Sequence, residues 1–273
     1  MPDFTGARIG LLEARLGDEI AGMVRRLGGQ VACAPAVREV PLAIPDLCGG
    51  FVSRLASARD PVLVCLTGAG VRALLAQASQ QGCLPALHDA MERATTVCRG
   101  PKPAGALAAH GLPVSLRAAE PFTTAEVMSV MEPLPLKGRL VALLHYGEEN
   151  AALSSWLRDR GAELHDLLPY EWHLPEDTAP VARLADEIIA GRIDAVAFTS
   201  QVQVRHLLAI AGPDRRAPLV EALNRGTVVG AIGPTCSAAL EAAGIKPAVV
   251  ASPPKLAPLL AALARALHNR PTA

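Results

Sequence analysis

The feature that most constrains this chain is an internal repeat in which similar segments stand 133 positions apart. The segment "CRGPKPAGALAAHG" (98–111) matches "AIGPTCSAALEAAG" (231–244), and both carry Gly-Pro near the start and Gly at the end. At the same spacing, "LTGAGVRALL" (66–75) falls on "TSQVQVRHLL" (199–208). Matches that share one register predict a duplicated unit, and a repeat of this length has the size of a small α/β domain.

Each copy alternates short apolar runs with Ala-rich amphipathic segments. Runs such as "PVLVCLT" (61–67) and "DAVAFTS" (194–200) are apolar without alternation, which indicates strands buried on both faces. Two of the Ala-rich segments stop at Gly111 and Gly244, as helices do at a C-terminal cap. The pattern predicts the α/β class, with two doubly wound parallel-sheet lobes and a cleft between them.

Two proline-rich segments, 35–45 and 168–180, have the composition of linkers. They occupy equivalent places inside the two copies, after the second strand of each, rather than the boundary between copies. We therefore expect the structural domains to differ from the sequence repeats.

The composition excludes some classes of function. The chain has 26 basic and 26 acidic side chains, so its net charge gives no reason to expect nucleic acid or an anionic membrane as a partner. Neither a signal peptide nor an apolar stretch of membrane-spanning length is evident, and we expect a cytoplasmic protein.

The six cysteines form no C-x-x-C motif and are predicted to be reduced, partly buried thiols. The seven histidines form no H-x-x-x-H pair, and no metal site is expected.

The turns that follow the predicted strands are the candidate binding elements. In an open parallel sheet, ligands bind at the carboxyl ends of the strands, where helix N-termini also favour anions. The turns "LTGAG", "FTSQV", "CRGPKP" and "AIGPTC" supply main-chain N–H groups, hydroxyls and two cations, and Pro101 and Pro234 suit the first turn of a helix. Such turns fit a ligand with several carboxylates or phosphates. The alternative is that their Thr and Ser side chains only cap helices.

The segment "TGAGVRA" (67–73) contains G-x-G-x-x-A, which is typical of dinucleotide-binding turns. However, Arg99 rather than an acidic residue follows the next predicted strand, and the second copy lacks the motif. A nucleotide-dependent oxidoreductase therefore remains only a third possibility. No catalytic motif such as G-x-S-x-G, H-E-x-x-H or a P-loop is present. If the chain is an enzyme, positioning of a reactive substrate carries much of its chemistry.

Four segments resemble the uroporphyrinogen-III synthase family, and together they span most of the chain. They are 231–247, "AIGPTCSAALEAAGIKP"; 197–208, "AFTSQVQVRHLL"; the opening 11–40; and 169–175, "PYEWHLP", which carries the family's tyrosine. The resemblance implies two lobes joined by two antiparallel linker strands. It places 1–37 with 176–273 in the first lobe, 45–168 in the second lobe, and 38–44 and 169–175 in the linkers.

The resemblance also implies the reaction. The substrate would be hydroxymethylbilane, a linear tetrapyrrole with eight carboxylates. The enzyme, a lyase, would drive loss of its hydroxyl, ring closure and inversion of ring D, through a spiro intermediate and without a cofactor. We expect a monomer that meets hydroxymethylbilane synthase at most transiently.

By position in the motifs, Tyr170 matches the family tyrosine and is expected to assist departure of the hydroxyl; its alternative is a linker tyrosine packed between the lobes. Arg15 matches the opening arginine, either as a carboxylate partner or as a solvated surface side chain. The expected substrate-binding residues are Arg15, Thr67, Gly68, Arg99, Gly100, Lys102, Thr199, Ser200, Gln201, Gly233, Pro234 and Thr235.

The middle of the chain departs from the family pattern. Gly68 stands where Ser is common, and Pro103 follows Lys102 in place of a Thr-type turn. This leaves open a second function from another class, in which the chain is a tetrapyrrole-binding sensor that has kept the fold and lost turnover.

Overall fold

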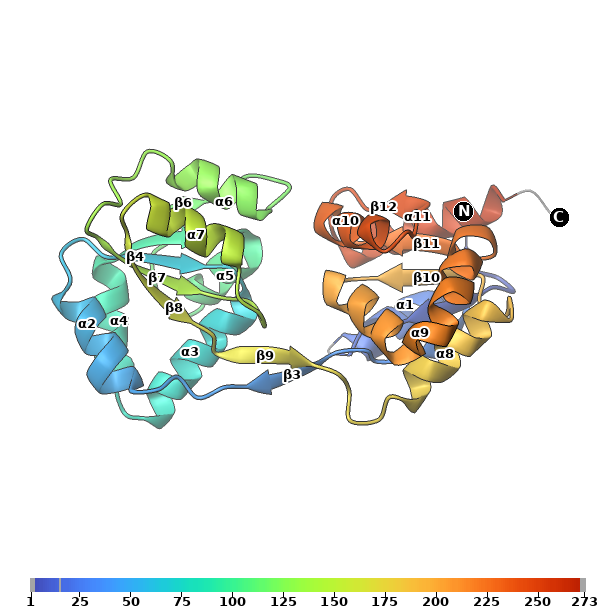
Figure 1. Ribbon diagram of the computed structural model, residues 1–273, viewed down its shortest axis with the longest axis horizontal. Helices are drawn as coiled ribbons and strands as arrows, with labels where there is room; N and C mark the ends of the chain where they lie inside the picture. Colours follow the sequence, from blue (N-terminus) through green and yellow to red (C-terminus); the bar gives the residue numbers. More distant parts are fainter. Residues whose placement is uncertain (1–2, 15, 271–273) are drawn as a thin grey trace. The chain divides into compact units, whose positions relative to one another are not determined.

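The computed structural model describes residues 3–14 and 16–270, which divide into two compact units. Unit 1 contains Met1–Arg38 and His173–Ala273, and unit 2 contains Glu39–Trp172. In Figure 1, unit 1 combines the dark blue start of the chain with the yellow-orange to red segments from α8 onward, and unit 2 holds the lighter blue to yellow segments between them. The chain thus leaves unit 1 after Arg38 and returns to it at His173.

Unit 1 is built on a five-stranded parallel sheet in the order β12-β11-β10-β1-β2. Its two halves come from opposite ends of the chain, and Leu11 of the first strand pairs with Ala197. The strands are β1 (Arg8–Leu11), β2 (Gln30–Cys33), β10 (Ala195–Phe198), β11 (Val228–Ala231) and β12 (Val249–Val250).

Helices cover both faces of the unit 1 sheet. They are α1 (Gly17–Arg26), α8 (Ala179–Ile189), α9 (Gln201–Arg225), α10 (Pro234–Ala242) and α11 (Leu256–His268). Helices α1 and α11 pack with Ile9 and Ala197 on one face, whereas α8, α9 and α10 pack with Val196 and Phe198 on the other. Because both faces are covered, the strand residues are apolar without alternation. Helix α9 bends at Gly212, where φ is 77°.

Unit 2 repeats this design with the strand order β6-β5-β4-β7-β8, again all parallel. Its strands are β4 (Val62–Cys65), β5 (Thr95–Cys98), β6 (Leu116–Arg117), β7 (Leu140–Leu144) and β8 (Glu163–Leu167). Its helices are η1 (Leu47–Val52), α2 (Ser53–Ser57), α3 (Gly68–Gln80), α4 (Leu84–Arg93), α5 (Pro101–Ala108), α6 (Thr124–Met131) and α7 (Ala151–Asp159).

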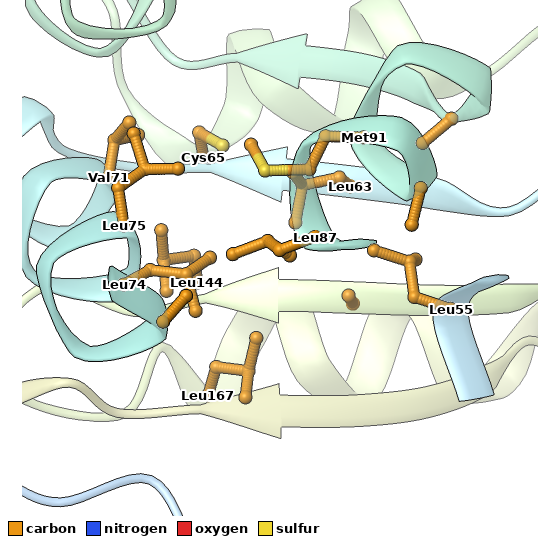
Figure 2. Packing of buried hydrophobic residues seen from close by; sticks show 14 of the residues in the cluster. Leu55, Leu63, Cys65, Val71, Leu74, Leu75, Leu87, Met91, Leu144 and Leu167 are labelled. Atoms are coloured by element: carbon orange, nitrogen blue, oxygen red, sulfur yellow. The ribbon is translucent and has the colours of Figure 1, made fainter. Parts of the chain in front are cut away.

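The core of unit 2 lies on both faces of its sheet. Figure 2 shows one side, where Leu63 and Cys65 of β4 meet Leu74 of α3 and Met91 of α4. On the opposite face, Val64 packs with residues of α6 and α7. The prediction of an α/β protein with two helix-flanked parallel sheets is therefore confirmed, and each sheet mixes strands from both sequence copies.

The crossings between the units coincide with the proline-rich segments. Strands β3 (Arg38–Pro41) and β9 (Tyr170–His173) pair in a two-stranded sheet. Just beyond it, the Leu42 N–H donates to the Pro169 carbonyl oxygen at 3.0 Å. Among the described residues, no helix is both long and apolar enough to cross a membrane.

The prediction that all six cysteines are reduced is wrong for Cys48 and Cys83, which form a disulfide in unit 2. The two residues are 35 positions apart, but η1 and the start of α4 bring their Cα atoms to 5.8 Å, within disulfide range. No local sequence motif predicts a disulfide between two cysteines that only the tertiary fold brings together. Free thiols remain at Cys33, Cys65, Cys98 and Cys236, and burial raises the pKa of Cys98 and of Cys236 to about 12.

Candidate functional site

The carboxyl ends of the unit 2 strands gather a polar and aromatic group. Thr67 follows β4, Arg99 follows β5, Tyr146 follows β7, and β9 adds Tyr170. The Thr67 Oγ1 lies 3.1 Å from the Tyr170 hydroxyl, and the Arg99 guanidinium carbon lies 4.8 Å from the centre of the Tyr146 ring. The structure thus brings together three residues predicted for the site, Thr67, Arg99 and Tyr170, with Tyr146, which the sequence did not single out.

Thr67 has both of the roles that the sequence left open. As the N-cap of α3, its Oγ1 accepts the Gly70 N–H at 3.0 Å. The same oxygen contacts the hydroxyl of the buried Tyr170. Because Thr67 receives a hydrogen from Gly70, it can donate its own hydrogen to Tyr170, and the phenol hydrogen can then serve another acceptor.

Arg99 is a cation with no ion-pair partner among the residues that the structure describes. Burial lowers the pKa of its guanidinium, while the neighbouring Tyr146 and Tyr170 act in the opposite direction. A partly buried charge without a carboxylate is unfavourable until an anion binds to it. The chemistry of this arrangement therefore favours an anion as its partner.

Two glycines of the predicted site pack against the chain itself. A Cβ on Gly68 would lie 2.7 Å from the Lys102 carbonyl oxygen, so a side chain there would push α3 away from α5. This explains why the turn has no Ser at position 68. Gly68, the first glycine of "TGAGVRA", therefore lets α3 and α5 approach each other. A Cβ on Gly100 would lie 3.2 Å from the Phe122 ring, and Pro101 and Lys102 follow in the exposed first turn of α5.

Trp172 was not singled out from the sequence, yet it ties β9 to the end of β7. Its main-chain N–H donates to the Gly147 carbonyl oxygen at 3.1 Å, and its ring lies 5.6 Å from the Tyr146 ring and 6.4 Å from the Tyr170 ring. Gly147 has a φ of 69°, and a Cβ on it would lie 2.3 Å from the Trp172 ring. Only glycine fits this approach, which sets the position of β9 and of Tyr170.

A buried histidine fixes the chain at the end of β7. The His145 Nδ1 accepts the Asn150 N–H at 3.1 Å, so its Nε2 carries the hydrogen and donates to Asp166 at 2.8 Å. Arg158 also binds Asp166, at 2.8 Å. Asn150 in turn caps α7 through the Leu153 N–H. The network holds the chain that carries Tyr146.

Unit 1 has a corresponding group at the ends of β1 and β10. Thr199, Ser200 and Gln201 follow β10, and Ser200 caps α9 by accepting the Gln203 N–H at 3.4 Å. Thr199 donates its hydroxyl hydrogen to Glu13, which follows β1. The sequence pattern did not indicate Glu13, because its partners are distant along the chain.

The remaining predicted residues of unit 1 lie at the next turn or outside the residues that the structure describes. Gly233 precedes α10, Pro234 begins it, and Thr235 is exposed in its first turn. The main-chain N–H groups of Gly233 and Thr235 lie at a helix N-terminus, where anions are favoured. Arg15 lies outside the described residues.

One group of side chains in the described residues has ligand atoms close enough for a metal ion, namely His88, Asp89 and Glu92 of α4. Their ligand atoms lie within 4.8 Å of one another, but Asp89 and Glu92 are exposed. Exposed acidic groups of this kind are common on protein surfaces without a bound ion. Nothing connects this group to the strand ends described above.

The chain forms two parallel sheets flanked by helices. Each sheet combines strands from both copies of the repeat and ends in polar turns. These features define the class, a duplicated two-unit α/β protein. The chain belongs to the uroporphyrinogen-III synthase HemD family, whose family model matches residues 18–261.

Individual relatives agree with this membership. YjjA of Bacillus subtilis strain 168 is 29% identical over 245 residues, and the match covers 88% of each chain. A crystal structure of a mutant uroporphyrinogen III synthase from the thermophilic bacterium Thermus thermophilus has 29% identity and a TM-score of 0.77, over 97% of this chain and 100% of that one. The uroporphyrinogen-III synthetase of Helicobacter pylori 26695 has 16% identity and a TM-score of 0.57 over 97% and 100%, a likeness of fold alone.

Proposed function

We propose that this protein is a uroporphyrinogen-III synthase, a lyase that closes hydroxymethylbilane into uroporphyrinogen III with inversion of ring D. The observation that carries the proposal is the pair of hydroxyls on the buried Tyr170 and the half-buried Thr67, 3.1 Å apart, in a chain of this family. Arg99 beside them, which has no ion-pair partner among the described residues, supports a substrate rich in carboxylates.

Tyr170 assists departure of the substrate hydroxyl in this proposal. The phenol donates its hydrogen to the leaving oxygen, the C–O bond breaks, and the oxygen departs as water. Loss of the N–H proton of the same pyrrole gives a neutral azafulvene, and that proton restores the phenol. Thr67 orients the Tyr170 hydroxyl by a hydrogen bond of 3.1 Å.

Four further turn residues bind the substrate's periphery. Arg99 pairs with a carboxylate, and the main-chain N–H groups of Lys102 and Thr235 donate to further carboxylates in the first turns of α5 and α10. Ser200 and Thr235 add hydroxyl donors. This reaction requires geometry more than a strong base, because the azafulvene is reactive and closes without inversion when unguided.

The test is a coupled assay in which hydroxymethylbilane is generated in place, the protein is added, and the oxidised I and III isomers are separated. We expect excess III isomer with the protein and only the I isomer in the blank. A folded sample that yields only the I isomer would contradict the enzyme proposal. The next measurement would then be tetrapyrrole binding, as expected for a sensor.

A further inference from the structure

The carboxylate of Glu13 is the most unexpected group at the strand ends of unit 1. Strands β1 and β10 are neighbours, with Leu11 paired to Ala197, so the turns that follow them meet at one edge of the sheet. Glu13 there accepts hydrogen bonds from Thr199 and from the Gln203 Nε2 at 3.2 Å. Ligands bind at this edge in open parallel sheets.

The hydrogen-bond directions in this cluster are set by one main-chain group. The Thr199 N–H donates to the Gln203 Oε1 at 2.8 Å, so the other end of that amide is its NH₂ group. This Nε2 donates to the Thr199 Oγ1 at 2.7 Å and also to Glu13. Thr199 therefore accepts from Gln203 and gives its own hydrogen to Glu13. Its hydroxyl is already committed as a donor.

The cluster of Glu13, Thr199 and Gln203 therefore offers a ligand a hydrogen-bond acceptor with negative charge. Among the residues that the structure describes, no Lys, Arg or His forms an ion pair with Glu13. Within the described part of the chain, the other Glu13 oxygen receives only a long hydrogen bond, 3.4 Å from the Leu16 N–H. An ionised carboxylate has about four acceptor positions, so capacity remains for another donor. A carboxylate of a ligand would be repelled here.

We propose that Glu13 accepts a hydrogen bond from a pyrrole N–H of the ligand. Unit 1 then recognises the nitrogen edge of a pyrrole at this turn. The inference rests on the proposed function, because it takes the ligand to be a tetrapyrrole. It assigns Thr199 and Gln203 as positioning residues that hold Glu13.

The experiment measures the dissociation constant of uroporphyrinogen III under anaerobic conditions, by quenching of tryptophan fluorescence, for the wild type and Glu13→Gln. The substitution preserves size but removes the charge. We expect the dissociation constant to rise about tenfold, as for loss of one charge-assisted hydrogen bond. Glu19→Gln, an exposed change on α1, is the matched control and should bind like the wild type.

A second probe separates donor recognition from anion recognition. Benzene hexacarboxylate carries carboxylates but no N–H, so Glu13→Gln should leave its affinity unchanged or strengthen it. If Glu13→Gln is poorly folded by circular dichroism, Glu13→Ala replaces it with the same expectations. Uroporphyrinogen binding that is unchanged or tighter in these variants would overturn the inference.

The outcome is distinguishable from failure of the proposed function. A wild type that yields no III isomer, but binds uroporphyrinogen III in a Glu13-dependent way, would refute the synthase proposal and keep this one. A wild type that makes the III isomer, with Glu13→Gln unchanged in affinity and turnover, would do the reverse.

Discussion

The Tyr170 hydroxyl lies 3.1 Å from the hydroxyl of Thr67, so the strand that returns the chain to unit 1 is joined to the N-terminus of α3. Tyr170 is buried, and the ring of Trp172 beside it packs against Gly147. The tyrosine is therefore held in one place, as a proton donor in a site needs to be.

We predict that Tyr170→Phe lowers kcat for the III isomer by about 10² to 10⁴, the usual contribution of a general acid. Stability should fall by only about 1 kcal/mol, since the ring remains and one hydrogen bond is lost. Steady-state kinetics and thermal unfolding measure the two effects. Tyr146→Phe, at the other tyrosine of the chain, is the control and should retain most activity, because its ring still faces Arg99. Equal losses in both variants would refute the assignment.

Thr67→Val should lower both the stability of the fold and the turnover of the enzyme. The Gly70 N–H loses its acceptor, which costs about 1 kcal/mol for an N-cap, and Tyr170 loses its orienting partner. Thr67→Ser keeps the hydroxyl and should behave like the wild type in urea unfolding and in the coupled assay. If Val and Ser are equally active, Thr67 is a cap and nothing more.

Arg99→Met is predicted to weaken substrate binding without lowering the stability of the fold. Burial lowers the Arg99 pKa because it removes water from the charged group, and no carboxylate among the described residues offsets this loss of hydration. An apolar side chain should therefore leave the melting temperature equal or raised, while KM for hydroxymethylbilane rises at least about tenfold. Arg59→Met, at a side chain that is 98% exposed, is the control. A lower melting temperature with unchanged KM would show that Arg99 is structural.

The fold was predictable because its signals are local. Runs such as Val62–Cys65 are apolar at every position since both faces of the sheet are covered, and the repeat predicts the second set of strands from the first. Gly111 and Gly244 have φ of 71° and 80°, as helix-ending glycines should.

The site was predictable only in part, because its remaining members meet through the tertiary fold. Thr67, Arg99 and Tyr170 carry local signals in turns or in a family motif. By contrast, Glu13 is 186 positions from Thr199, and no pattern along the chain relates them. The Arg99–Tyr146 contact likewise depends on the order of strands in the sheet, in which β5 and β7 lie on either side of β4.

The last prediction concerns Cys48 and Cys83, whose disulfide joins η1 to the start of α4. It closes a loop of 35 residues, so its removal should lower the stability of unit 2 by about 2–4 kcal/mol, chiefly by freeing the unfolded chain. Urea unfolding of the Cys48→Ser, Cys83→Ser double variant, against the wild type without reductant, measures the difference. Thiol titration in denaturant should find four free thiols before reduction and six after it. Six before reduction would show that the bond does not form, and the loss of stability should then vanish as well.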